Sequence, residues 1–90
     1  MSTAPTRDEL DAMFKPLIIW AFAYNANFPN NPVDYRDFMF MGNDGDVSMY
    51  KHGFTRRYLH IGTDGPLSWS NGTYVPVADV LALVKAVYEP

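Results

Sequence analysis

Residues 41–75, "MGNDGDVSMYKHGFTRRYLHIGTDGPLSWSNGTYV", decide the fold of this 90-residue chain. Short runs of β-branched, aromatic and methionine residues alternate here with turns in which glycine stands beside or near asparagine or aspartate. These turn residues accept the positive φ angles of tight hairpins. The strand-like runs are 37–41, 47–51, 55–61, 67–70 and 73–75. Runs at this spacing predict an antiparallel meander of three to five strands.

A helix is predicted before the meander. Thr6 begins the sequence "TRDE", a capping box in which its hydroxyl accepts the N–H of Glu9. Apolar residues then recur at helical spacing as far as Tyr24. Pro16 interrupts this pattern, so we expect a kink or a break near Lys15. The segment 17–23, "LIIWAFA", is apolar on every side, and such a helix should lie between layers or contact a second subunit.

A second helix is predicted after the meander. Pro76 suits a first helical position, and an apolar stripe follows it as far as Val87. Asp79 would lie in the first turn of this helix and Lys85 in the last. The fold class is therefore α+β: an N-terminal helix, the antiparallel meander and a C-terminal helix. We expect one domain, 1–90, with a loose terminus over 1–5 and an Asn/Pro-rich loop over 26–34.

Composition narrows the class of protein. A chain with 48% hydrophobic residues is too apolar to be disordered, and a net charge of −3 disfavours nucleic-acid binding through bulk charge. The chain has no cysteine, which excludes disulfides and thiolate metal sites. The first residues do not resemble a secretory signal, and the apolar run 17–23 is much shorter than the ~20 residues of a membrane span. We expect a cytoplasmic protein with no membrane association.

The stretch 51–62, "KHGFTRRYLHIG", holds three of the seven Lys and Arg residues and both histidines. Side chains alternate between the two faces of a strand. Leu59 and Ile61 are expected to face the core, with Val47 and Met49 of the preceding strand beside them. The opposite face would then carry the aromatic and basic side chains Tyr50, His52, Phe54, Arg56, Tyr58 and His60. Either Phe38 and Phe40 or Met39 and Met41 would extend this face, depending on register.

Two arrangements of the helices remain open. If both helices cover one face of the sheet, the other face is an exposed aromatic and basic surface, and such patches usually mark interaction sites. If one helix covers each face, the aromatic residues belong to the core. The candidate residues for binding a partner are Tyr50, Lys51, His52, Arg56, Tyr58, His60 and Trp69. Histidines at such a face would make affinity change between pH 5 and 8.

Catalytic signatures are weak. The two histidines are eight residues apart with no HxH or HxxxH pair, and the "GNDGD" turn lacks the spacing and the later glutamate of a calcium loop. No serine lies in a G-x-S-x-G elbow, and no glycine-rich loop precedes G-K-[ST]. We therefore expect no enzymatic activity, no cofactor and no metal.

The expected function is protein–protein interaction through the aromatic and basic face. Small α+β chains without motifs are similar in character to bacteriophage accessory proteins, many of which occlude a host protein. One alternative is single-stranded nucleic-acid binding through the same face, since aromatic rings stack on bases. The other is a self-assembling structural subunit, a homo-oligomer formed through Leu17, Trp20 and Phe22.

Overall fold

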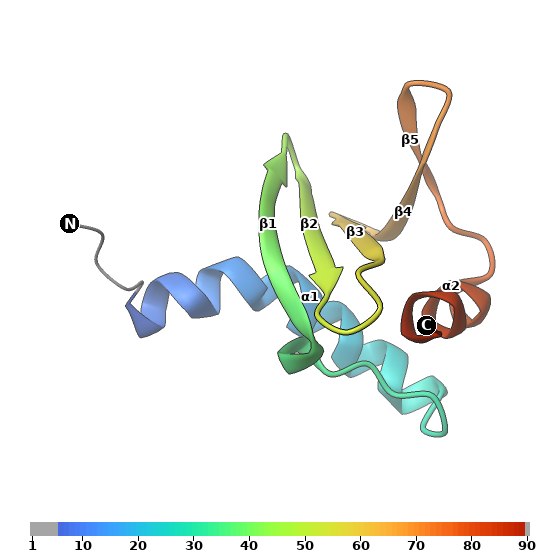
Figure 1. Cartoon of the computed structure of the whole chain (residues 1–90), viewed down its shortest axis with the longest axis horizontal. Coiled ribbons are helices and arrows are strands. Elements are labelled where there is room, and N and C mark those ends of the chain that lie inside the picture. The colour runs from blue at the N-terminus through green and yellow to red at the C-terminus, as the bar shows by residue number, and fades with distance from the viewer. Residues whose placement is uncertain (1–5, 90) are drawn as a thin grey trace.

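The computed structural model describes residues 6–89 and has the α+β order that the sequence predicts (Figure 1). The expected loose terminus, 1–5, lies outside the described residues. Two helices enclose a short 3₁₀ helix and five strands in the order α1 (Arg7–Asn27), η1 (Tyr35–Asp37), β1 (Phe38–Asp44), β2 (Val47–His52), β3 (Tyr58–Gly62), β4 (Gly65–Ser70), β5 (Thr73–Pro76) and α2 (Val80–Tyr88). Within residues 6–89, no helix is long and apolar enough to cross a membrane.

Helix α1 begins where the capping box predicts. The Thr6 hydroxyl accepts the N–H of Glu9 at 3.2 Å. Of the two outcomes predicted near Lys15, a kink or a break, the break is wrong, because α1 continues through Pro16 to Asn27. Pro16 has no N–H to donate to the carbonyl of Ala12, but Ala12 is exposed, so water can solvate that carbonyl. Phe14 before Pro16 packs against the core and Leu17 after it lies in the core, and these contacts hold the helix together.

The five strands form one antiparallel sheet in the order β1-β2-β3-β4-β5, which confirms the meander. The β4–β5 turn shows why the turn sequences predict hairpins. Its central residues Asn71 and Gly72 have φ angles of 51° and 84°, the two positive values that a type I′ hairpin turn requires. A bulge between Phe40 and Gly42 interrupts the pairing of β1 with β2.

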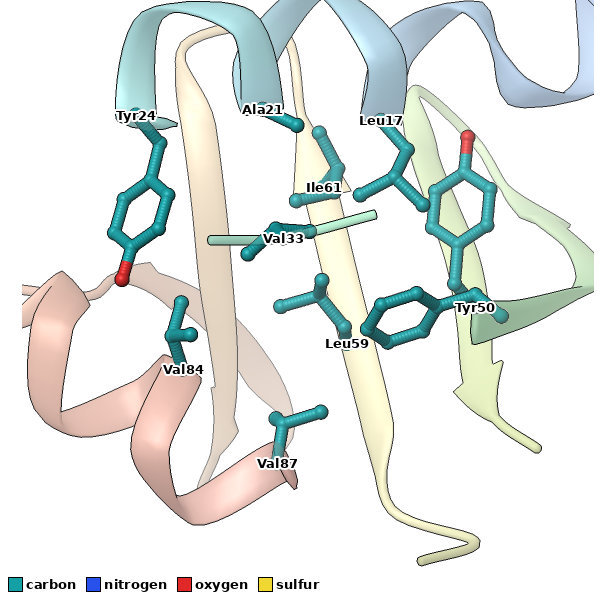
Figure 2. Close-up of a cluster of buried hydrophobic side chains, with 10 residues drawn as sticks. Leu17, Ala21, Tyr24, Val33, Tyr50, Leu59, Ile61, Val84 and Val87 are labelled. Carbon is teal, nitrogen blue, oxygen red and sulfur yellow. The ribbon is translucent and has the colours of Figure 1, made fainter. Parts of the chain in front are cut away.

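Both helices pack on the same face of the sheet (Figure 2). The core between them contains Leu17, Ala21 and Tyr24 from α1, Val33 from the loop, Phe38, Tyr50, Leu59 and Ile61 from the sheet, and Val84 and Val87 from α2. Asn25 fixes the loop that follows α1, because its side chain exchanges hydrogen bonds of 2.9 and 2.7 Å with the backbone of Val33. Of the two arrangements that the sequence leaves open, the protein therefore adopts the one in which both helices cover the same face of the sheet.

The two faces predicted for β2 are exchanged: Val47 and Met49 were expected on the core side, and Tyr50 and His52 on the other. Tyr50 pairs with Leu59 and Ser48 with Ile61, so Tyr50 and His52 lie on the core side, whereas Met49 pairs with His60 on the other side. The cause is the loop 53–57, which the sequence assigns largely to a strand. Arg56 has a φ of 67°, so the chain turns here instead of continuing the strand. A register change of one residue exchanges the two faces of a strand.

Helix α2 begins later than predicted. Pro76 ends β5, where it pairs with Leu67. Asp79 is the N-cap of α2, since its side chain accepts the N–H of Ala82 at 3.0 Å. The loop 53–57 holds the other end of this helix. The Thr55 hydroxyl donates to the Val87 carbonyl at 2.6 Å, and Arg57 Nε donates to the Glu89 carbonyl at 3.1 Å.

Candidate interaction face

The face of the sheet opposite the helices is covered by neither of them (Figure 1). We call it the open face. Strand alternation and register assign to it Met39, Met49, Lys51, Tyr58, His60, Leu67, Trp69 and Tyr74. Three of these side chains are large, apolar and strongly exposed: Met39 at 44%, Tyr58 at 44% and Trp69 at 54%.

Aromatic rings on the open face contact one another in a row. The rings of Tyr58 and His60 stack at 5.9 Å, those of His60 and Tyr74 lie 5.5 Å apart, and Tyr74 meets Trp69 edge to face at 4.8 Å. Lys51 Nζ lies 5.6 Å from the centre of the Tyr58 ring. The ring contacts hold these side chains in place, so a partner would meet an ordered surface rather than separate mobile residues.

The open face is concave. The Tyr74 hydroxyl donates to Asp44 Oδ2 at 3.1 Å, which joins β5 to the end of β1. These are the outermost strands, and in a flat sheet four strand spacings would separate them by about 19 Å. That distance exceeds the combined reach of a tyrosine and an aspartate. The sheet must therefore curl toward the open face, away from the helices.

The open face carries little charge. Lys51 is its cation, and Asp44 supplies a carboxylate beside Tyr74. Burial lowers the pKa of His60, and the nearby Asp44 carboxylate opposes this shift only in part. His60 is therefore neutral at pH 7. Burial, followed by the hydrogen bond to Asp44, raises the pKa of Tyr74, so that hydroxyl keeps its proton as well.

Four of the seven predicted partner-binding residues lie together on the open face: Lys51, Tyr58, His60 and Trp69. Arg56 is exposed but belongs to the loop 53–57. Sequence reasoning missed Tyr74. It pairs with Trp69 across the two-residue turn Asn71–Gly72, so the turn sequence alone would have placed both rings on one face.

Tyr50 and His52 are structural residues. Tyr50 is fully buried, and its hydroxyl donates to the Met13 carbonyl at 2.8 Å. His52 is 6% exposed, and its Nδ1 accepts the N–H groups of Phe54 at 3.2 Å and Thr55 at 3.1 Å. The His52 ring thereby shapes the β2–β3 loop from the core side. Neither residue can contact a partner at the open face.

The three residues predicted for self-association lie in different environments. Leu17 is fully buried in the core. Trp20 is half-buried and stacks on Tyr24 at a centroid distance of 5.0 Å. Phe22 is 81% exposed. Of the three, only Phe22 is available for a contact with another molecule across most of its surface.

Among residues 6–89, no three histidine, aspartate or glutamate side chains are grouped so that they would hold a metal ion. No protein-family model, curated protein or solved structure matches the chain.

Proposed function

We propose that this chain is a small binding protein that recognises a protein partner through the open face and acts by occlusion, without catalysis. The proposal rests chiefly on one observation: a concave, ordered and nearly uncharged surface with Met39, Tyr58 and Trp69 about half exposed. Aromatic and methionine side chains are enriched in the cores of protein interfaces, where charged residues are depleted. The partner would present a convex apolar element that fits this concave surface.

The low positive charge of the open face favours a protein partner over a nucleic acid. Proteins that bind single strands combine stacking rings with a positively charged groove. The open face has the rings, but it has one lysine, a neutral His60 and the carboxylate of Asp44. A nucleic-acid backbone would meet too little positive charge there. Single-stranded nucleic-acid binding therefore becomes the outcome that the experiment must exclude.

The test uses the tagged chain, two variants and a cell lysate that is divided into a nuclease-treated and an untreated half. The double variant Tyr58→Ala with Trp69→Ala removes two of the three exposed anchors and should lose at least 90% of the captured partner. Arg56→Glu changes a residue of the loop 53–57, away from the open face. This variant serves as the matched control and should retain the captured partner. Circular dichroism and thermal unfolding verify that both variants fold.

The purified partner then allows a direct measurement. Trp20→Phe leaves Trp69 as the single tryptophan, and its fluorescence emission should shift on binding. Equal capture by the folded double variant would overturn the assignment of the open face. Capture that disappears with nuclease, together with affinity that falls steeply with salt, would support nucleic-acid binding instead.

A further inference from the structure

The solvent side of the second half of α1 is apolar. Residues 16–27 contain no charged residue, and within them Ile18, Ile19 and Phe22 are exposed at 38%, 60% and 81%. The sequence predicts burial of this segment on more than one side. A single copy of the fold buries only the side that carries Leu17 and Ala21. One side of the segment therefore remains uncovered.

Helical geometry defines the uncovered side. At 3.6 residues per turn, Lys15, Ile19, Phe22, Ala23 and Ala26 project opposite the buried positions of α1. We call these five residues the α1 ridge. Grooves flank it on both sides. One is lined by Ile18, Ala21, Asn25 and the loop 32–36, and the other by Pro16, Trp20 and the β3–β4 turn.

The sizes of the ridge residues are self-complementary under two-fold symmetry. Consider two antiparallel α1 helices whose two-fold axis passes between residues 22 and 23. Phe22 then faces Ala23 of the second copy, and Ile19 faces Ala26 of the second copy. Each large apolar side chain meets an alanine, which lets the two helices approach closely and interdigitate. Because the axis repeats every contact, one patch serves both copies.

Charges favour the same antiparallel arrangement. It places Lys15 just beyond Ala26 of the second copy, near the carboxyl end of that helix, which carries partial negative charge. The last turn of α1 has no basic residue of its own. The acidic first turns, with Asp8 and Glu9, lie at opposite ends of the pair, about 40 Å apart at 1.5 Å per residue. A parallel pair would bring those carboxylates side by side.

Two other modes of association fit less well. An anionic membrane surface would be repelled by Asp8, Glu9 and Asp11, and Lys15 is the only cation of the ridge. Extension of the sheet is disfavoured at both edges, since β1 contains a bulge and β5 is four residues long and ends at Pro76. We propose that the chain forms a closed antiparallel dimer through the α1 ridge. This interface is separate from the open face.

The first test is the mass in solution as a function of concentration. Sedimentation equilibrium between 5 and 500 μM should show the mass rising from 10.2 kDa toward twice that value. Phe22→Lys should remain monomeric throughout, while Tyr58→Ala with Trp69→Ala should dimerise like the parent chain. A mass of one chain at every concentration would overturn the proposal, as would dimerisation of folded Phe22→Lys.

Cysteine cross-linking tests the register, because the chain has no cysteine of its own. In Ala23→Cys the two thiols lie beside the two-fold axis, so diamide should oxidise them to an intermolecular disulfide within minutes. Ala12→Cys is the matched control, exposed on the same helix but about 30 Å from its equivalent in the antiparallel pair. Cross-linking of Ala12→Cys as fast as Ala23→Cys would contradict the antiparallel register.

Discussion

Two buried tyrosines give opposite predictions for the same chemical change. Tyr24 and Tyr50 are 4% and 0% exposed, and burial raises the pKa of both hydroxyls. The Tyr50 hydroxyl donates to the Met13 carbonyl at 2.8 Å. The Tyr24 hydroxyl points from α1 toward α2 and has no hydrogen-bond partner among the described residues (Figure 2). Replacement by phenylalanine removes one oxygen in each case.

The expected magnitudes follow from the hydrogen bonds. Tyr50→Phe loses the buried hydrogen bond from its hydroxyl to the Met13 carbonyl, which should lower the free energy of unfolding by about 1 kcal/mol. Tyr24→Phe removes a desolvated hydroxyl that has no hydrogen-bond partner, so this variant should raise the free energy of unfolding by about 1 kcal/mol. In a domain of this length, 1 kcal/mol shifts Tm by roughly 4–8 °C. The two variants should therefore differ by roughly 8–16 °C.

The assay is urea unfolding at pH 7 and 25 °C, followed by circular dichroism and supported by thermal scans of the same samples. A Tyr24→Phe variant less stable than the parent chain by 0.5 kcal/mol or more would refute the reasoning, because it would show that the hydroxyl has a partner. An unchanged Tyr50→Phe variant would show that its hydrogen bond contributes nothing net.

Two further predictions concern the sheet and its loop. Because the pKa of His60 is lowered in the folded state, its contribution to stability is present above the unfolded value of about 6.5 and is lost as pH falls below it. Urea midpoints at pH 8 and pH 5 should show a smaller acid loss in His60→Gln than in the parent chain, and equal losses would exclude this role. Arg56 has a φ of 67°, so Arg56→Gly should raise the free energy of unfolding by about 0.5–1 kcal/mol. A lower urea midpoint in Arg56→Gly would instead reveal a stabilising contact of the arginine side chain.

The sequence predicts the meander well because its turns are local. Asn71 and Gly72 adopt positive φ values, which asparagine tolerates and glycine takes freely because it has no Cβ, and the strands on either side follow. The N-cap at Thr6 is equally local. The sequence could not decide between a kink and a break at Pro16, because the effect of a proline depends on whether water reaches the carbonyl it leaves unpaired, and that depends on the tertiary fold.

The open face was only half predicted, and register explains why. "TRRYLHI" has the composition of one strand, but the left-handed conformation of Arg56 moves its first residues into a loop. The pairing of β2 with β3 then places Tyr50 and His52 on the core side. Alternation correctly grouped Tyr58 with His60, since both lie within β3. Relations within a strand are local, whereas relations between strands depend on the loop that joins them.

The contacts at the end of α2 have a consequence for the order of folding. A helix of nine residues is too short to be stable alone in water. Its last carbonyls accept hydrogen bonds from Thr55 and Arg57, which reach them only once the β2–β3 loop has its native shape. We infer that the β2–β3 hairpin forms before α2 docks, so that the C-terminal helix folds after this hairpin and exchanges its amide hydrogens before it.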